Sequence, residues 1–496
     1  MTHTIIWFRK GLRLCDNPAL LAAAVRATQL WPIFILDPWF VNPARVGHNR
    51  MLFLLDSLRD LDVQLRRLGS RLFVLRGQPQ EVLEERFDTW QIGRLCFERD
   101  TEPYARDRDS RVSAYAQGRG IDVISPTAHT LFDPDLTIAA GGHAPATYSA
   151  FLRVLKKLGD PARPLDAPRD LPPPGECDPE AHGIPTLGEL GYDVTDDRQP
   201  VHQGGETAGR ERLNAYLSNQ GRVASFAKPA TDPTAFDPPS TTALGPHLKF
   251  GCLSARTFYH GVQDVYKEAG THTEPPVSLL AQILWREFFY TLGYATPNYD
   301  RMEGNPLSRQ IPWDDNPEYL TAWSEARTGY PWIDAAMSQL ATEGWLHHLT
   351  RHCVACFLTR GDLWQSWEKG QAVFDRLLVD QDWSLNASNW MWLSASAFFH
   401  AYHRVYGPVS FAKKYDPEGR FVRHYLPVVA RLPKEFIYEP WKAPLSVQRS
   451  TGCVIGRDYP GPIVEHEKVK THNIERMRLA FEAARNTEVS RSTVLG

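Results

Sequence analysis

The sequence of 496 residues lacks the features that would place it in a membrane or around a structural metal. No apolar run approaches the roughly 18 residues of a membrane span, and residues 4–8 are too short for a signal peptide. The only CxxC, Cys353 to Cys356, has no second pair or spaced histidines, and H-E-x-x-H is absent. These absences predict a soluble, intracellular protein with no metal site and no membrane partner.

Neither cysteine nor net charge is prominent. The seven cysteines are scattered and odd in number, which is typical of reduced thiols inside a cell. The net charge of −3 and the pI near 6.6 argue against a polycationic coat for nucleic acid. A local basic groove stays open as an interpretation.

A dinucleotide fingerprint is missing where one would be expected. Short apolar runs alternate with amphipathic segments up to residue 135, which predicts a parallel, doubly wound sheet. The expected strands are 5–8, 32–36, 72–75, 95–98 and 121–124. Asp16-Asn17-Pro18 predicts a helix start after the first strand, but no G-x-G-x-x-G lies there. An NAD-dependent dehydrogenase is therefore disfavoured.

Proline separates the two halves of the chain. Residues 161–200 hold nine prolines, which indicates an extended connector, and helical patterns dominate beyond about residue 205. Examples of these patterns are 277–292, 332–340, 345–358, 372–378 and 473–484. We expect an α/β domain over 1–135, a Pro-rich connector over 136–204 and an all-α domain over 205–496.

Tryptophan and buried polar groups concentrate in the second half. Ten of the 15 tryptophans lie between Trp285 and Trp392. Residues 380–392 hold two aspartates, two asparagines and three tryptophans, and an apolar segment follows. Buried carboxylates and amides need partners, and no local partner is obvious, so we expect a bound heteroaromatic cofactor. A turn beside an aromatic core is the alternative.

Two further patterns suit electron or proton transfer. Trp313, Trp364, Trp367 and Trp390 are oxidisable indoles, with Trp364 and Trp367 predicted on one helix face; plain aromatic packing is the alternative. His348 and His352 are four apart, so they share a helical face and could act as acid and base near neutral pH. Structural histidines are the alternative for this pair.

Two patterns suit anion binding. Residues 240–245 offer hydroxyls at a predicted helix start, as in phosphate sites, although capping explains them equally well. Residues 404–423 interleave basic side chains with tyrosines, which suits a nucleic-acid backbone and an unstacked base. A solvated charged loop is the alternative for this segment.

The chain resembles the cryptochrome/photolyase flavoproteins over nearly its full length. The matching motifs are Trp7–Leu14, Leu248–Ser254, Trp285–Phe288, Arg327–Pro331 and Asp380–Trp392. Residues 344–352, Gly-Trp-Leu-His-His-Leu-Thr-Arg-His, resemble most the animal-type branch, which holds (6-4) photolyases and animal-like cryptochromes.

This resemblance implies a U-shaped FAD in the helical domain. Asp382 would face the flavin ring, Asn386 would lie opposite flavin N5, and Arg351 would pair with Asp380 beside it. The other residues expected at the cofactor are Thr241, Thr242, Leu244, Gly245, Gln282, Arg286 and His348. Trp390, Trp367 and Trp313 match the family's electron-transfer triad, and Trp364 matches a fourth position found in the animal-type branch.

The resemblance also implies a reaction, in which light drives an electron from reduced FAD to a flipped-out pyrimidine (6-4) photoproduct in UV-damaged DNA. His348 and His352 match the lesion pocket, with His352 as the proton donor. The lesion and phosphate contacts would be Lys228, Gln282, Trp285, Trp392, Arg404, Tyr406 and Lys414. A deazaflavin or folate antenna is a further expected cofactor, and the protein is expected to be a monomer.

A light-signalling cryptochrome that acts through protein partners is the rival interpretation, and both functions could coexist. Only about a dozen polar residues, 485–496, follow the last predicted helix, which favours the enzyme over a long-tailed signalling protein. His352 disfavours repair of cyclobutane dimers. A nuclear location in a eukaryote is expected from the family.

Three positions depart from the family pattern. Gly245 stands where Ser is usual, Ser388 where Gly is usual, and Cys15 where His is usual. The first two are expected to alter flavin affinity or redox behaviour.

Overall fold

The computed structural model describes residues 2–175, 182–193, 200–236 and 238–494, with the backbone alone from residue 486 onward. The chain forms two compact units. Unit 1 comprises Met1–Ala230, Thr242–Ala295 and Val379–Asp382, and unit 2 comprises Thr231–Thr241, Thr296–Leu378 and Trp383–Gly496. Each unit draws on several segments of the chain, so this division cannot be compared directly with domains that follow one another in the sequence. The predicted domain limits at residues 135 and 204 stay a prediction.

Unit 1 is built on a parallel sheet, as the alternation of apolar runs predicts. Its strands are β1 (Thr2–Phe8), β2 (Ala27–Leu36), β3 (Phe73–Arg76), β4 (Arg94–Phe97) and β5 (Asp122–Ile124). The strand order is β3-β2-β1-β4-β5, and every neighbouring pair is parallel. All five predicted strands are confirmed. Their order reverses direction between β1 and β4, which makes this edge a topological switch point.

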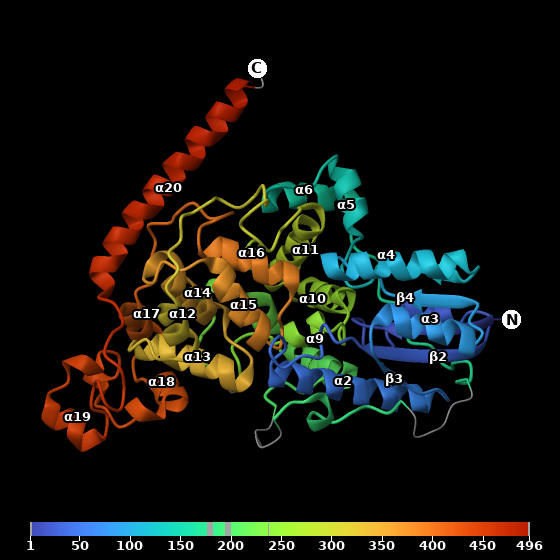
Figure 1. Ribbon diagram of the computed structural model, residues 1–496, viewed down its shortest axis with the longest axis horizontal. Coiled ribbons are helices and arrows are strands. Elements are labelled where there is room, and N and C mark those ends of the chain that lie inside the picture. Colours follow the sequence, from blue (N-terminus) through green and yellow to red (C-terminus); the bar gives the residue numbers. More distant parts are fainter. Residues whose placement is uncertain (1, 176–181, 194–199, 237, 495–496) are drawn as a thin grey trace. The chain divides into compact units, whose positions relative to one another are not determined.

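Helices cover both faces of this sheet, since the side chains of β1 alternate between two cores. Ile6 and Phe8 pack with α1 (Pro18–Ala24) and α2 (His48–Arg67). Ile5 and Trp7 pack with α3 (Pro79–Thr89) and α4 (Pro103–Gly118). In Figure 1, α2 and α4 accordingly lie on opposite sides of the strands. Asn17 caps α1 by accepting from the amide of Leu20, as the Asp-Asn-Pro sequence predicts.

The remaining helices of unit 1 belong to its middle and later segments. They are α5 (Pro134–Gly141), α6 (Tyr148–Leu158), α7 (Glu206–Leu217), α8 (Gln220–Ser225), α9 (Gly245–Lys249), α10 (Ala255–Ala269) and α11 (Leu279–Ala295), with short 3-10 turns η1 (Gly188–Leu190) and η2 (Lys228–Ala230). Helix α6 and all but the first two residues of α5 lie inside the segment 136–204 that was predicted as a connector.

Unit 2 is helical. Its α-helices are α12 (Pro317–Ser324), α13 (Pro331–Glu343), α14 (His348–Cys356), α15 (Trp367–Leu377), α16 (Trp383–Leu393), α17 (Pro408–Tyr415), α18 (Arg420–Tyr425), α19 (Leu445–Thr451) and α20 (His466–Val494). Shorter turns are the π-helix η3 (Phe357–Gly361) and the 3-10 turns η4 (Pro427–Val429), η5 (Lys434–Phe436) and η6 (Pro440–Lys442). No strand follows β5 in the described part of the chain, which confirms the helical character predicted beyond residue 205.

Two details of the prediction are wrong. Trp364 does not share a helix face with Trp367, because α15 begins at Trp367 and Trp364 lies in the preceding turn with a positive φ of 53°. The last helix does not end near residue 484, because α20 continues to Val494. Within the described ranges, no helix combines the length and apolarity that crossing a membrane requires.

Candidate functional site

Unit 1 contains a pocket at the carboxyl ends of its strands. The pocket has about 850 Å³ of space, including open solvent at its mouth. Trp7 and Lys10 come from the end of β1, Asp37 follows β2, and Glu102 follows β4. These positions flank the point where the strand order reverses, which is where open parallel sheets bind ligands. The pocket therefore lies where a small-molecule site is expected.

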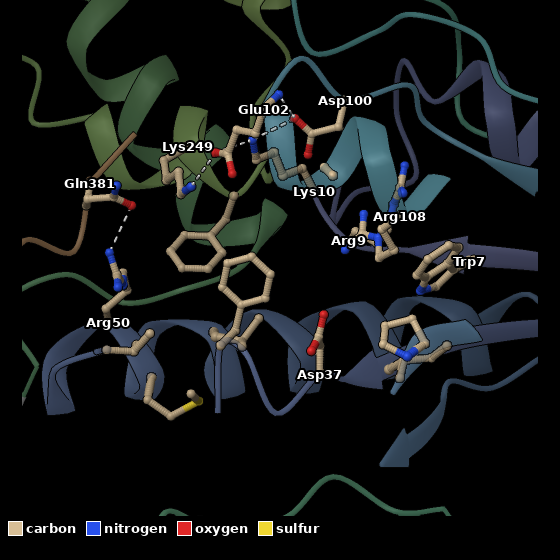
Figure 2. Close-up of a pocket in the computed structure, with 18 residues that line it drawn as sticks. Trp7, Arg9, Lys10, Asp37, Arg50, Asp100, Glu102, Arg108, Lys249 and Gln381 are labelled. Carbon is tan, nitrogen blue, oxygen red and sulfur yellow. Dashed lines mark hydrogen bonds and ion pairs between the residues drawn. The ribbon is translucent and has the colours of Figure 1, made fainter. Parts of the chain in front are cut away.

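The walls of this pocket combine apolar surface with paired charges (Figure 2). Lys10 Nζ lies 3.1 Å from Asp100 Oδ1 and 2.8 Å from Glu102 Oε1, and Lys249 Nζ lies 3.5 Å from Glu102. Burial disfavours the charged form of Lys10, but Asp100 and Glu102 outweigh it and raise its pKa. Burial lowers the pKa of Lys249, and the neighbouring Glu102 carboxylate opposes this lowering. The pocket thus holds ionised side chains that a polar ligand can engage.

The segment 379–382 connects this pocket to a second group of buried residues in unit 1. Gln381 lines the pocket and accepts a 2.9 Å hydrogen bond from Arg50. The next residue, Asp382, is 3% exposed and accepts a hydrogen bond from the Tyr290 hydroxyl. Arg286 lies on α11 one turn before Tyr290. It is also buried and pairs with Glu287 at 2.6 Å. The structure thus brings together the predicted cofactor residues Arg286 and Asp382.

Asp380 approaches the start of α9 closely. A Cβ placed on Gly245 would lie 2.6 Å from Asp380 Oδ2 and 3.0 Å from Asp380 Cβ. A serine at this position would therefore push the Asp380 carboxylate aside. The departure from the family pattern at Gly245 has a structural consequence, because the missing side chain makes room for Asp380.

The predicted phosphate loop around α9 is divided between the units. Thr242, Leu244 and Gly245 belong to unit 1, whereas Thr241 belongs to unit 2. Arg212 donates to the Thr242 carbonyl at 2.8 Å, and the amide of Leu244 lies 3.4 Å from the Thr242 hydroxyl. Arg351 of unit 2 and Asp380 of unit 1 are divided in the same way, so their pairing stays a prediction.

Three predicted DNA-binding residues cluster along α11 in unit 1. The amide of Lys228 donates to the Val277 carbonyl at 3.0 Å, just before α11. Gln282 lies on the first turns of that helix and donates to the Ser278 carbonyl at 3.1 Å. Trp285, one turn further, stacks on Tyr148 with ring centroids 3.8 Å apart. The helix therefore presents an amide and a supported indole near one lysine.

The predicted histidine pair is confirmed as a geometric pair in unit 2. Both residues lie on α14, and their ring centroids are 5.8 Å apart. His347 caps this helix, because its Nδ1 accepts from the Leu349 amide and its Nε2 bonds the Ser240 hydroxyl at 3.3 Å. The Tyr406 hydroxyl lies 3.4 Å from His352 Nδ1. The structure therefore joins His352 to a second predicted lesion contact.

The amide of Asn386 has a defined orientation. Its Nδ2 donates to Asp375 Oδ1 at 2.6 Å and to the Gln371 carbonyl at 3.3 Å. Both partners are acceptors only, so the atom of the amide that faces them must be the nitrogen. The carboxamide oxygen therefore points away from them. A buried amide oxygen held in this way is an acceptor for a protonated ring nitrogen, which fits the flavin position that the resemblance implies for Asn386.

The four predicted electron-transfer tryptophans all lie in unit 2. Trp313 and Trp364 are in contact, with centroids 4.9 Å apart. Trp367 and Trp390 are fully buried, and Gly370 allows Trp390 to lie against α15, since a Cβ there would meet the indole at 2.2 Å. Among the described residues, no ring contact joins Trp367 or Trp390 to the outer pair. The structure therefore confirms one contact of the proposed chain.

The other predicted DNA contacts of unit 2 lie near the end of α16, in the loop that follows it and on α17. Trp392 packs on Phe398 and Phe399 with centroid distances of 6.4 and 6.1 Å. Arg404 and Lys414 are exposed, as phosphate contacts require. Their assignment as DNA contacts stays a prediction.

Sequence reasoning missed several residues of these sites. They are the pocket residues Lys10, Arg50, Glu102 and Lys249, the Asp382 partner Tyr290 with His129 behind it, and Asp375 beside Asn386. Polar residues directly after predicted strands, such as Lys10 and Glu102, were a usable signal for the pocket. The partners of Asp382 and Asn386 carry no local signal.

Comparisons with known families support these observations. Residues 4–171 match the model of DNA photolyase, and residues 279–479 match the FAD binding domain of DNA photolyase. Among solved structures, a bacterial class III photolyase from Agrobacterium tumefaciens has a TM-score of 0.84 at 27% identity, covering 97% of this chain and 98% of its own.

Curated relatives are similar over most of their length. The (6-4)DNA photolyase of Oryza sativa subsp. japonica is 52% identical over 481 residues, which is 93% of this chain and 87% of the relative. The (6-4)DNA photolyase of Arabidopsis thaliana is 48% identical, covering 96% of this chain and 88% of the relative. Cryptochrome-1 of Mus musculus is 46% identical, covering 97% of this chain and 80% of the relative.

Proposed function

Because the chain belongs to the photolyase and cryptochrome family and carries its FAD-binding domain, we propose that it is a (6-4) DNA photolyase. The observation that carries this proposal is the 52% identity to a (6-4)DNA photolyase over 93% of the chain. The substrate is UV-damaged DNA with a pyrimidine (6-4) photoproduct, which must leave the base stack to be reached. The enzyme acts as a monomer.

The proposal assigns roles to the residues of each unit. In unit 1, Arg286, Asp380 and Asp382 hold the cofactor together with Thr242, Leu244, Gly245 and Gln282. In unit 2, the oxygen of Asn386 accepts a hydrogen bond from the ring, and Thr241 and Arg351 complete the site. FAD supplies the light-driven electron when it is bound.

The histidines supply the proton chemistry. His352 donates a proton to the lesion, since its ring lies on the same face of α14 as His348 and next to the Tyr406 hydroxyl. His348 lies between His347 and His352 and orients the lesion. Trp285, supported by Tyr148, and Gln282 contact the flipped base, together with Trp392 and Tyr406. Lys228, Arg404 and Lys414 neutralise phosphates.

Repair tests the function directly. Purified protein with reduced FAD is given an oligonucleotide with one (6-4) photoproduct and exposed to blue light, and the return of the undamaged bases is followed by chromatography. We expect repair in light and none in darkness. A flavin-loaded protein that binds the damaged strand and restores no base would contradict the enzyme assignment.

His352→Ala should reduce the repair rate by at least about 100-fold, because a general acid contributes 10²–10⁴ to a rate. Affinity for damaged DNA and photoreduction of the flavin should stay within about twofold of the unchanged protein. His403→Ala, an exposed histidine in the same unit, is the matched control and should keep full repair. Turnover retained by His352→Ala would remove the assigned role.

Electron supply through the tryptophans has its own test. Trp390→Phe should remove most of the photoreduction rate of oxidised flavin, measured by absorption under steady blue light. Trp323→Phe is the matched control, because Trp323 is also fully buried and lies outside the predicted path. Its ring centroid is 6.1 Å from that of Trp390. Equal rates in the two variants would exclude Trp390 from the path.

The pocket of unit 1 is proposed as an antenna site for a deazaflavin or a folate. Its position at the switch point, its indole floor at Trp7 and its lysines fit a planar chromophore with polar groups. A related archaeal photolyase of 25% identity and TM-score 0.76 is described as having two FAD molecules and a novel light-harvesting cofactor.

The antenna proposal is tested by adding an 8-hydroxydeazaflavin or methenyltetrahydrofolate to the FAD-loaded protein and recording the action spectrum of flavin photoreduction. One of the two should add a band where that chromophore absorbs. Ala105→Phe, which fills the pocket, should abolish this band, whereas Ala146→Phe on an exposed loop should not. An unchanged spectrum with both chromophores would refute the site.

A signalling cryptochrome is the second candidate, favoured by the 46% identity to a Cryptochrome-1. It predicts light-dependent binding of a protein partner and no repair. The repair assay separates the two functions, and a positive result in both assays would establish a dual role.

A further inference from the structure

Three buried residues of unit 1 form a continuous hydrogen-bonded line. His129 Nε2 lies 2.7 Å from the Tyr290 hydroxyl, and that hydroxyl donates to Asp382. The three side chains are 6%, 1% and 3% exposed, respectively. They come from the loop before α5, from α11 and from the segment before α16, so only the folded unit brings them together.

The chemistry of these groups fixes the direction of each hydrogen bond. A carboxylate only accepts hydrogen bonds, so the Tyr290 hydroxyl is the donor in its hydrogen bond to Asp382. The Tyr290 oxygen can then only accept from His129, which assigns the proton of the imidazole to Nε2. Burial lowers the pKa of His129 well below its usual value and raises that of Tyr290 well above it, so both residues are neutral at pH 7.

Arg286 holds this line in place from the side. Its guanidinium lies 4.5 Å from the centre of the Tyr290 ring and donates to the His129 carbonyl at 2.9 Å. Glu287 accepts from Arg286 at 2.6 Å and from the amide of Leu131 at 2.7 Å, which anchors the His129 loop to α11. The position of the Tyr290 hydroxyl is therefore fixed by contacts on both elements.

Three cationic side chains of unit 1 face the Asp382 carboxylate. Lys10 and Lys249, on the loop after β1 and on α9, and Arg286 on α11 all interact electrostatically with this carboxylate. The opposing acidic groups already have cationic partners of their own. They are Asp100 and Glu102 beside Lys10, Glu287 beside Arg286, and Glu98 beside Arg13.

We propose that Tyr290, itself oriented by His129, is a positioning residue that aims the Asp382 carboxylate as a hydrogen-bond acceptor for the flavin ring. This inference rests on the proposed function, in which Asp382 holds the ring of FAD. A carboxylate fixed in this way would accept from the imide N–H of the isoalloxazine ring. Without the phenol, the carboxylate loses the contact that fixes its orientation.

The test measures the release of FAD from the full-length holoprotein at pH 7, followed by the rise of free flavin fluorescence. Tyr290→Phe should release FAD about tenfold faster, the loss expected for one hydrogen bond to a charged group. The resonance Raman band of the flavin imide N–H reports on the hydrogen bond at that group, and it should shift toward its position in free flavin. The unchanged protein should keep this band in the hydrogen-bonded position.

Tyr259→Phe is the matched control, because Tyr259 is a buried tyrosine of unit 1 that donates to Asp160 at 3.0 Å, outside the predicted cofactor residues. It should release FAD at the unchanged rate and leave the imide N–H band in place. His129→Ala tests the same line if Tyr290→Phe does not fold, and it should show a smaller acceleration with a shift of the band in the same direction.

The outcomes separate this inference from the function on which it rests. An unchanged protein that retains FAD, with Tyr290→Phe and His129→Ala both releasing it like Tyr259→Phe, overturns the inference alone. Faster release with the imide N–H band unchanged also overturns it, since that would be a packing effect. A purified protein that binds no FAD overturns the cofactor assignment and this inference with it.

Discussion

The two units bury different kinds of side chain. Unit 1 buries charge, as in Arg13 with Glu98 and Arg286 with Glu287. Unit 2 buries indoles, since all the tryptophans among the largest fully buried side chains except Trp7 belong to it. A buried charge is stable only beside a partner of opposite sign, whereas a buried indole needs shape and at most one hydrogen bond.

This difference matches the work proposed for each unit. Ionised groups at fixed positions can orient a polar ligand, which suits the pocket and the Tyr290–Asp382 line in unit 1. An aromatic interior with few ionised groups suits the passage of an electron through Trp313, Trp364, Trp367 and Trp390 in unit 2. We therefore expect unit 1 to lose stability when a buried charge pair is broken. We expect unit 2 to lose stability when a buried aromatic side chain loses its hydrogen-bond partner.

The largest effect is expected in unit 1, from Lys10→Met. Lys10 is the common partner of Asp100 and Glu102, so its loss leaves two carboxylates facing each other in a mostly buried site. We expect the free energy of unfolding to fall by about 3–5 kcal/mol, measured by urea denaturation. Lys249→Met is the control, with a smaller loss because Lys249 has one partner at 3.5 Å. Equal losses would show that charge pairing does not organise this unit.

A smaller effect is expected in unit 2 from Ser388→Ala. The hydroxyl of the fully buried Tyr299 lies 2.6 Å from Ser388 Oγ, so the substitution leaves a buried phenol without its partner. The expected loss of stability is about 1–3 kcal/mol. Tyr299→Phe combined with Ser388→Ala should recover part of it, which a double-mutant cycle measures. Strict additivity would show that the serine acts through something other than this hydrogen bond.

The smallest effect concerns pH and the one strongly buried acid–histidine pair near α20. Burial raises the pKa of Asp362 to about 6, although His466 donates to it at 2.6 Å. The folded protein therefore binds a proton here more tightly than the unfolded chain, whose Asp has a pKa of about 3.9. The free energy of unfolding should fall as the pH rises from about 4 to about 6 and then level off.

Asp362→Asn removes this titration and should flatten that part of the stability profile, measured by urea denaturation at a series of pH values from 4 to 7. Asp315→Asn, at an exposed position of the same unit, should leave the profile unchanged. A slope that persists in Asp362→Asn would assign the pH dependence to another carboxyl group.

The fold was largely predictable from local patterns. The five apolar runs became the five strands because parallel strands buried on both faces need continuous apolar sequence. The start of α1 was predictable because Asn17 caps it locally. Trp364 was misplaced because the chain leaves the helical conformation at Thr359, inside the π-helix η3, and again at Trp364, which residue spacing does not reveal.

The candidate site was predictable only where residues lie close in sequence. The pair His348 and His352 follows from helical spacing, and the buried amide Asn386 follows from its apolar surroundings. The pocket at the switch point and the room that Gly245 gives to Asp380 depend on segments more than 100 residues apart. Polar residues directly after the strands indicate where the pocket lies, but a single sequence does not show which residues meet across such distances.

The sequence by itself determined the kinds of element and the chemical types of the site residues, because periodicity and capping act within a few neighbouring residues. Tertiary structure alone decided which of those residues meet. Tyr290 reaches Asp382 across 92 positions, and Asn386 receives its orientation from a different helix, because hydrogen-bond geometry is satisfied in space and leaves no mark on residue order.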